Sequence, residues 1–378
     1  MKKAIATTII ILSCCCINAQ IVFTGTVYDK DTNQPIPDVY VSFNRTIAYA
    51  ITDDSGKFEL TLAQRLNTQL VFSHIAYEMV IIENPFDEFP EEIYMEQRLN
   101  MLSDVVVSAK VSPEYADPFT RAQKLKIFRE QFLGTTRAGK ACIIMNESDI
   151  ELRYDIRTNT LLASSDNPVV VLNEYLGYLI SFSLVDFRIE YAVQLNWFEP
   201  KYSNPNFFSR DASGRMVSSP SAVEQSLILS NSYNVQRSYY TVISSFADLS
   251  PNDIKIKKRR DEIYDQSSTL FFKNLVNNTL EESDFRIFEG RPRQVVDQSK
   301  YFTIDEDDKL SLKRLRLIPD AGSIINVRYR NKLSILNFHT DTLLVDRYGN
   351  IDQFDKVLFT GMMGDTRVGD MLPLDYEP

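Results

Sequence analysis

Thr52-Asp53-Asp54-Ser55-Gly56-Lys57-Phe58-Glu59-Leu60 is the stretch that decides the fold of the N-terminal part of the chain. Its first half predicts a tight turn, because aspartate and serine side chains bond the nearby backbone and glycine tolerates a positive φ. Its second half alternates apolar and polar residues, which is typical of a β-strand with one buried face. A turn followed directly by such a strand indicates an antiparallel β-structure.

The same pattern recurs on either side of this stretch. Alternating residues in 23–27 and 39–43 and the short apolar run 70–72 predict further strands, and Asp31-Thr32-Asn33-Gln34-Pro35 predicts another turn. Short strands joined by tight turns are typical of a β-sandwich. We therefore expect a mainly β protein, with an N-terminal antiparallel β-sandwich over residues 20–109.

Four motifs carry a resemblance to a known family: Gly25-Thr26-Val27-Tyr28-Asp29, Pro35-Ile36-Pro37-Asp38-Val39-Tyr40-Val41, the stretch from Thr52 to Leu60, and Phe72-Ser73-His74-Ile75-Ala76-Tyr77-Glu78. In order and spacing they resemble the carboxypeptidase-regulatory-like domain common in exported proteins of the Bacteroidetes. Asn33, Pro37 and Ala76 stand where that family favours glycine. The resemblance implies a transthyretin-like (prealbumin-like) sandwich without a peptidase centre.

The first residues have the pattern of an export signal. Lys2 and Lys3 precede the uncharged run 4–17, and Ala19 provides a small residue for cleavage, so we expect residues 1–19 to be a signal peptide. Leu12-Ser13-Cys14-Cys15 also resembles a bacterial lipobox, which makes a lipid anchor on Cys15 the alternative to cleavage after Ala19. Both interpretations predict an exported protein, located in the periplasm or associated with the outer membrane.

The remainder of the chain predicts a second, larger region. Pro113 and Pro118 mark 110–118 as a linker, and residues 119–378 have the pattern of an antiparallel α+β region. Apolar residues at helical spacing end at Gly134 and predict a first helix, while apolar residues between Ile263 and Val276 predict a second. Strands are expected over 141–191 and 310–359, with a long surface loop over 199–221.

Four segments of this region also resemble the C-terminal part of Bacteroidetes proteins that carry the same N-terminal domain. This resemblance implies no activity for any residue. The segments are 128–136, 173–178, Val345-Asp346-Arg347-Tyr348-Gly349-Asn350 and Met371-Leu372-Pro373-Leu374-Asp375-Tyr376. Residues 102–109 resemble the strand that follows the domain in TonB-dependent receptors, but the residues after them are too few for a barrel of about 22 strands.

The charge balance argues against nucleic acid as a partner. The chain has 51 acidic and 41 basic residues, a net charge of −10, which on average repels polyanions. The basic run Lys255-Ile256-Lys257-Lys258-Arg259-Arg260 is followed at once by Asp261 and Glu262, so we interpret it as the solvated start of a helix. The acidic run from Asp305 to Asp308 is interpreted as an exposed hairpin tip.

The sequence offers little material for catalysis. Its two histidines, His74 and His339, lie in separate strand-like runs, and the spacings of zinc peptidases, nucleophile elbows, phosphate loops and dinucleotide sites do not occur. Cys142 lies in an apolar run and is expected to be a buried thiol. We therefore predict no catalytic residue, no cofactor and no metal site.

Aromatic residues give the remaining functional signal. Near the expected central loop they could stack on sugar rings or bury a partner, and they are our candidate contacts for a ligand or partner: Trp197, Phe198, Tyr202, Phe207 and Phe208. The alternative interpretation is that the same side chains anchor the loop into the core. The predicted function is a non-catalytic cell-envelope protein that binds or scaffolds an unknown envelope protein or glycan. The alternatives are a cryptic hydrolase of peptides or glycans, and an accessory of a TonB-linked uptake system.

Overall fold

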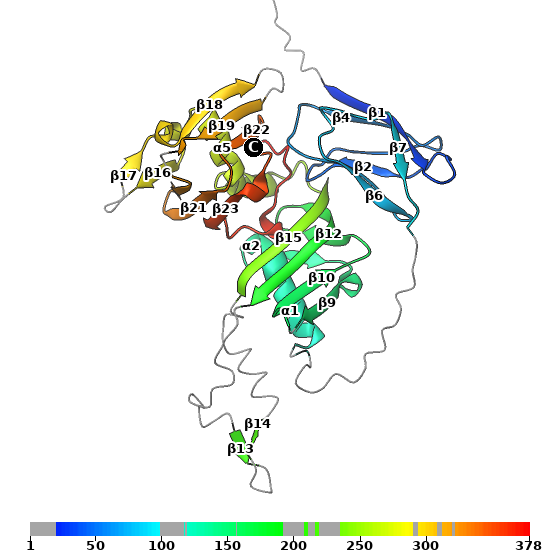
Figure 1. Ribbon diagram of the computed structural model, residues 1–378, viewed down its shortest axis with the longest axis horizontal. Helices are drawn as coiled ribbons and strands as arrows, with labels where there is room; N and C mark the ends of the chain where they lie inside the picture. Colours follow the sequence, from blue (N-terminus) through cyan, green and yellow to red (C-terminus); the bar gives the residue numbers. More distant parts are fainter. Residues whose placement is uncertain are drawn as a thin grey trace, which may run out of the picture.

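The structure is a computed structural model that describes residues 20–98, 117, 119–155, 157–191, 208–210, 216–218, 235–289, 294–307, 312–319 and 322–378. The predicted signal peptide, with Cys15 and Ala19, and all of the predicted linker except Asp117 lie outside these residues. The fold is mostly β with antiparallel sheets, which confirms the predicted fold class. Three separate hydrophobic cores divide the described chain into three units (Figure 1).

The first unit, the sandwich unit (residues 20–98), is the predicted β-sandwich. One sheet has the order β4-β1-β7 and the other β3-β2-β5-β6. All neighbouring strands are antiparallel except β1 and β7, which are parallel. The strands are β1 (Ile21–Asp29), β2 (Tyr40–Phe43), β3 (Tyr49–Ile51), β4 (Lys57–Leu62), β5 (Leu70–His74), β6 (Tyr77–Ile82) and β7 (Glu92–Met95).

The predicted turns of the sandwich form as expected. Asp53 Oδ1 accepts hydrogen bonds from the N–H groups of Ser55 and Lys57, both at 2.9 Å, and Gly56 has a φ of 72°. Asn33, which stands where the family favours glycine, also has a positive φ of 53°. Asparagine tolerates this conformation better than most residues, so the substitution preserves the turn.

The central unit (residues 119–265) is a bent antiparallel sheet packed against helices. The sheet order is β8-β11-β12-β10-β9, and β15 pairs with the free side of β12. The short strands β13 (Phe208–Arg210) and β14 (Met216–Ser218) pair within the predicted surface loop. The other elements are α1 (Arg121–Phe132), α2 (Arg137–Lys140), β8 (Cys142–Ile144), η2 (Glu147–Asp149), β9 (Glu151–Asp155), β10 (Thr160–Ser164), β11 (Val169–Asn173), β12 (Tyr178–Tyr191), β15 (Val235–Asp248) and α4 (Ile254–Tyr264).

Helix α1 confirms the first predicted helix and its end. Thr120 and Gln123 form a capping box at its start, and Gly134 follows its C-cap with a φ of 93°. Phe128 and Phe132 are fully buried in the central core. The aromatic residues of this helix are therefore core residues.

The C-terminal unit (residues 268–363) contains a five-stranded and a three-stranded antiparallel sheet, with strand orders β17-β16-β20-β21-β23 and β18-β19-β22. Its helix α5 packs into the core of the unit. The elements are α5 (Ser268–Val276), η5 (Leu280–Glu282), β16 (Phe285–Glu289), β17 (Gln294–Val296), η6 (Gln298–Lys300), β18 (Phe302–Asp307), β19 (Leu312–Leu317), β20 (Ile324–Tyr329), β21 (Lys332–Phe338), β22 (Thr342–Val345), η8 (Phe354–Lys356) and β23 (Val357–Gly361).

Three predictions about the region from residue 255 to residue 308 need correction. The single helix expected between Ile263 and Val276 is the end of α4 followed by α5, because Ser267 caps a new helix. The basic run does begin a helix, but Arg260 is buried. Asp305 and Glu306 belong to β18 and form ion pairs with Arg316 and Lys313 of β19, so the acidic run is not confined to a hairpin tip.

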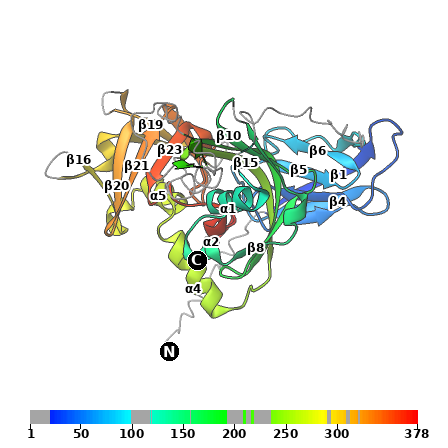
Figure 2. The same cartoon turned by 90° about the horizontal axis from the view of Figure 1, so that it is seen from below.

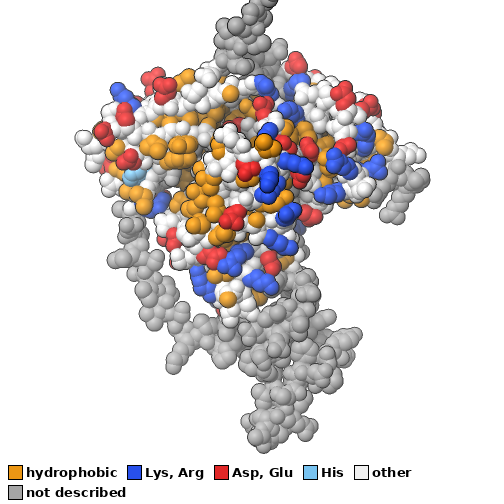
Figure 3. Space-filling view, turned by 180° about the vertical axis from the view of Figure 1, so that it is seen from behind, with side chains coloured by type: hydrophobic (Ala, Val, Ile, Leu, Met, Phe, Trp, Pro, Cys, Tyr) orange, Lys and Arg blue, Asp and Glu red, His pale blue; other side chains and the backbone are white. Residues whose placement is uncertain are grey.

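After β23 the chain returns to the central unit. The short helix η9 (Val368–Asp370) lies against α2, and residues 371–378, here called the tail, end beside α4 (Figure 2). Basic, acidic and apolar side chains are interspersed over the face opposite to that of Figure 1 (Figure 3). Among the described residues, no helix is both long and apolar enough to cross a membrane.

Candidate functional site: the junction of the three units

Several buried polar contacts lie where the three units meet, and we call this region the junction. Asn67, in the loop between β4 and β5, reaches from the sandwich unit into the C-terminal unit. Its N–H donates to Asp346 Oδ2 at 3.1 Å, and its Nδ2 donates to the carbonyls of Leu344 at 3.1 Å and Asn350 at 3.0 Å. One asparagine thus connects two units through three hydrogen bonds.

Asp346 is the acceptor around which this part of the junction forms. Its Oδ1 accepts from the N–H groups of Tyr348, Gly349 and Asn350 at 2.9 to 3.0 Å, and its Oδ2 also accepts from Asn350 Nδ2. Burial raises the pKa of Asp346, whereas the hydrogen bonds from Asn350, Asn67 and Tyr348 oppose that shift. With every oxygen partnered, this carboxylate acts as a structural acceptor.

The turn after Asp346 places an aromatic side chain in another unit's core. Tyr348 is buried among the core residues of the sandwich unit. Gly349 has a φ of 100°, and a Cβ at this position would lie 2.1 Å from the carbonyl oxygen of Thr269. Only glycine fits there, so the turn directs Tyr348 across the junction.

The sandwich unit also extends the sheet of the central unit. Beside the edge strand β15, the N–H of Arg45 donates to the Ser244 carbonyl at 2.7 Å, and the N–H of Phe246 donates to the Thr46 carbonyl at 3.0 Å. Asn44 Oδ1 accepts from the N–H of Ser244 at 2.9 Å. These bonds occupy backbone groups that an open sheet edge would expose.

The tail contacts all three units. The N–H of Leu374 donates to the Arg45 carbonyl at 2.7 Å, and its carbonyl accepts from Asn350 Nδ2 at 2.9 Å. Tyr376 donates its hydroxyl proton to Asp261 Oδ1 of α4 at 2.5 Å. The tail therefore bonds to the sandwich unit, the C-terminal unit and the central unit in turn.

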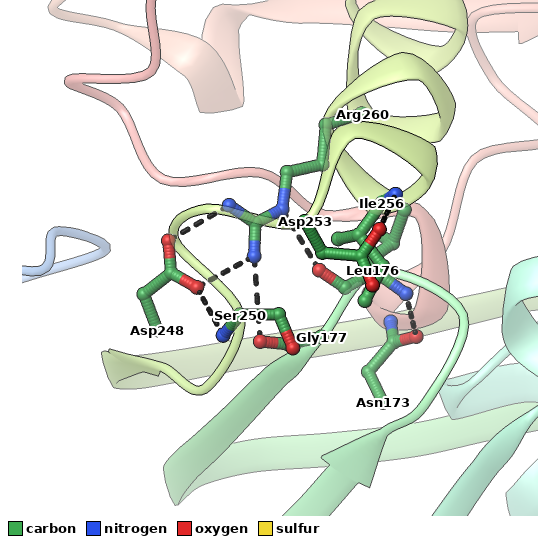
Figure 4. A network of polar contacts seen from close by, with 8 residues as sticks. All are labelled: Asn173, Leu176, Gly177, Asp248, Ser250, Asp253, Ile256 and Arg260. Carbon is green, nitrogen blue, oxygen red and sulfur yellow. Dashed lines mark hydrogen bonds and ion pairs between the residues drawn. The ribbon is translucent and has the colours of Figure 1, made fainter.

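Arg260 fixes α4 to the central sheet (Figure 4). Its guanidinium makes two hydrogen bonds of 2.7 Å to the Asp248 carboxylate, and its Nε donates to the Leu176 carbonyl at 2.8 Å. The same group lies 3.9 Å from the centroid of the Tyr178 ring. Arginine suits this position and lysine does not, because the guanidinium is planar, donates two hydrogen bonds to one carboxylate and stacks on an aromatic ring.

A second set of contacts joins η9 to the central unit. Thr136 donates its hydroxyl proton to Asp370 at 2.8 Å, and Asn173 Nδ2 donates to the Gly369 carbonyl at 2.9 Å. A Cβ on Gly369 would lie 2.4 Å from the Cα of Gly139, so the two backbones approach directly. Burial raises the pKa of Asp370, and the hydrogen bond from Thr136 opposes that shift.

The aromatic contact candidates cannot be placed. Trp197, Phe198, Tyr202 and Phe207 lie outside the described residues, and Phe208 begins β13, for which only the backbone is described. They stay a prediction from the sequence.

The residues considered for catalysis lie apart from one another. His74 is half-buried in β5, and its Nδ1 accepts from the N–H of Ala76 at 3.2 Å. His339 is exposed, and its backbone N–H donates to the Lys356 carbonyl at 2.7 Å. Cys142 donates to the Ala138 carbonyl, and burial raises the pKa of its thiol to about 12. A thiol with this pKa is a poor nucleophile.

One hollow, of about 340 Å³, lies at the outer edge of the C-terminal unit. Two carboxylates, Glu281 and Asp297, line it together with Arg286, Gln298 and apolar side chains. The hydrogen bonds from Ser299 hold the pKa of Asp297 below its usual range, because Asp297 caps η6. A glycosidase needs one carboxyl group with a raised pKa, so Asp297 does not suit that role. Within the described part of the chain, no group of three metal-ligating side chains comes together.

Two of the four segments that resemble related C-terminal regions meet at the junction, and the other two bond to η9. They supply Thr136, Asn173, Asp346 and Leu374, which all make the contacts described above. Sequence reasoning identified the segments but not the contacts that they make in the folded chain. It missed Asn67 and Asp248, which lie outside the segments and are recognisable only by their partners.

Comparison with known proteins identifies the first unit. The CarboxypepD_reg-like domain family matches residues 23–107. No curated protein and no solved structure matches the chain. The family match agrees with the sandwich topology and with the motifs between Gly25 and Glu78. Residues 23–107 are therefore similar to the CarboxypepD_reg-like domain family.

Proposed function

We propose that this protein is an exported, non-catalytic cell-envelope component of a Bacteroidetes-type bacterium. In this proposal it acts in the periplasm or at the outer membrane and binds or positions a partner, which is an envelope protein or a glycan. The observation that carries the proposal is the junction, which connects the CarboxypepD_reg-like domain to both other units.

The junction favours a scaffold because it fixes surfaces in relation to one another. Asn67, Thr46 and Tyr348 make contacts that a freely tethered domain would not need. The buried polar side chains of Asp346 and Arg260 form their hydrogen bonds with other groups of this same chain. A body with fixed surfaces is what a binding or scaffolding role requires, since rigid partners lose less conformational freedom on association.

The proposed location rests on the sequence. A basic start, an uncharged run and a small residue at Ala19 are typical of an export signal. Fractionation of the native host, with mass spectrometry of the mature N-terminus, tests it. An N-terminus at Gln20 or an acylated Cys15 in the envelope fraction is the expected result. A protein that still begins at Met1 and is found in the cytosolic fraction would contradict the proposed location.

The proposed lack of catalysis has its own test. The purified chain is incubated with peptide and glycan libraries, and the products are separated by mass spectrometry. We expect no turnover by the wild-type protein. Turnover that disappears in the His339→Ala variant, while the His74→Ala variant keeps it, would show a hydrolase and overturn the proposal.

A further inference from the structure

Helix α4 has an unusual order of charges. Lys255, Lys257, Lys258 and Arg259 lie in its first half, whereas Asp261 and Glu262 follow in its second half. The partial positive charge at the N-terminus of a helix favours acidic residues there and basic residues at the other end. The charges of α4 have the opposite order to the one that the helix dipole favours. Their arrangement points to an anionic partner.

The packing of α4 keeps most of these basic groups in solvent. Arg260 and Tyr264 are buried and attach one side of the helix to the central unit. Lys255, Lys257 and Lys258 are exposed. The helix lies at the rim of the molecule beside α2 and the chain end (Figure 2).

Exposed apolar side chains lie at the tip of this helix. Ile254, its first residue, is 84% exposed, and Leu249, in the loop before it, is 54% exposed. Pro251 lies between them and is also exposed. Nothing in the described chain covers Ile254, although burying such a side chain is favourable. The tip therefore combines uncovered apolar groups with adjacent positive charge.

Helix α2 extends the basic surface. The guanidinium groups of Arg137 and Arg259 lie over the Tyr175 ring, 5.2 and 4.7 Å from its centroid. Arg259 also donates to the Tyr175 carbonyl at 3.2 Å. The tyrosine thus holds two arginines from separate elements side by side.

Four acidic residues, Asp253, Asp261, Glu262 and Glu174, lie on α4 or beside it. Asp253 caps α4 by accepting from the N–H groups of Lys255 and Ile256. Asp261 lies 3.8 Å from Lys257 and accepts from Tyr376, while Glu174 is exposed next to Tyr175. Lys255, Lys258 and the two arginines at Tyr175 form no ion pair within the described residues. These basic groups are therefore available to an anionic partner, although the whole chain has a net charge of −10.

From these observations we infer that the tip of α4, with Arg137 and Arg259, is a docking surface for an anionic lipid membrane. Lysines and arginines are attracted to phosphate headgroups, and an exposed isoleucine gains free energy by entering the acyl region. A nucleic acid or an acidic protein would use the charges but would leave Ile254 and Leu249 without a role. The inference rests on the proposed envelope location and specifies the surface by which the protein is held there.

The experiment uses the mature chain beginning at Gln20, so that neither the leader nor a lipid contributes. Its sedimentation is measured with vesicles of phosphatidylglycerol and phosphatidylethanolamine, and with vesicles of phosphatidylcholine alone. We expect at least tenfold tighter binding to the anionic vesicles, and a decrease as salt is raised, since salt screens exposed charges.

Two variants test the two components of the surface. The double variant Lys255→Glu/Lys258→Glu should reduce anionic binding at least tenfold, whereas the control Lys57→Glu/Lys126→Glu makes the same charge change at exposed lysines elsewhere and should not. Ile254→Asp should weaken binding several-fold. Ile75→Asp is its matched control, because Ile75 is 83% exposed in the turn between β5 and β6.

Equal binding to both kinds of vesicle, or equal losses in test and control variants, would overturn the inference. So would binding to an acidic peptide or to DNA with no binding to vesicles. These failures would leave the proposed function intact, because it is tested by the location and turnover of the wild-type chain. A cytosolic, unprocessed protein would instead remove the basis for both.

Discussion

Asp375, in the tail, is a half-buried residue whose Oδ1 is shielded from solvent and for which no ion pair is found in the described structure. Its Oδ1 has no hydrogen-bond partner, while the backbone of Ile47 supplies a donor to the carboxyl group. Burial raises its pKa, because the charged form loses hydration that the protein does not replace. This residue therefore stabilises the junction less when it is ionised than when it is protonated.

The Asp375→Asn variant tests this interpretation. A neutral amide removes the buried charge, so we expect the variant to melt about 2 °C above the wild type at pH 8, for a gain on the order of 1 kcal/mol. A raised pKa in the folded state means that the stability contributed by the protonated group is lost as pH rises through that pKa. The gap between variant and wild type should therefore close as pH falls towards 4.

Differential scanning fluorimetry from pH 4 to pH 8 measures this gap. The control is Asp365→Asn, because Asp365 is exposed. If Asp375→Asn is less stable than the wild type at every pH, the Asp375 carboxylate accepts a stabilising hydrogen bond in solution. That result would contradict the interpretation.

At the scale of elements, α4 depends on Arg260. The residue is 5% exposed. Its guanidinium donates hydrogen bonds to one carboxylate and two carbonyls and lies over one aromatic ring. The Arg260→Lys variant keeps the charge but loses the bidentate geometry and the stacking. We expect it to lower the free energy of unfolding by about 2 kcal/mol.

Thermal unfolding followed by circular dichroism checks this expectation. The matched control is Arg153→Lys, since Arg153 is an exposed residue of β9. If both variants melt at the wild-type temperature, the contacts of Arg260 contribute little, and α4 is held by its apolar residues alone.

The elements that the sequence predicted are those with one buried and one exposed face. Residues 57–62 alternate strictly in both sequence and burial, which is why the sandwich strands were predictable. Arg260 was not, because a periodicity argument assigns every arginine to solvent. Its burial depends on Asp248 and Tyr178, whose approach arises only after β12 and β15 have paired.

At the scale of the whole molecule, the junction could not be predicted for a related reason. Asn67 and Asp346 are 279 positions apart, and neither has a local pattern that specifies the other. The segment from Val345 to Asn350 was noticed only through its resemblance to related chains. What the sequence could predict was the turn chemistry of Asp346 and Gly349, and the structure adds that this turn inserts Tyr348 into the sandwich core.

The coupling between units gives the last prediction. In the Asn67→Ala variant the carbonyls of Leu344 and Asn350 lose their shared donor, which should cost about 2 to 3 kcal/mol of coupling between the sandwich and C-terminal units. Each unit keeps its own core, so we expect the variant to fold. Its unfolding in scanning calorimetry should broaden or split into separate transitions, with the sandwich unit melting first.

Limited proteolysis provides a second readout, since a sandwich unit released from the junction exposes loops that the wild type protects. Asn84→Ala is the control, because Asn84 is an exposed asparagine of the same unit whose side chain makes no hydrogen bond in the described structure. If Asn67→Ala and Asn84→Ala unfold and are cleaved alike, the junction does not couple the units, and the scaffold proposal loses the observation on which it depends. A selective change in Asn67→Ala would instead show that the three cores are held as one body through a few buried polar groups.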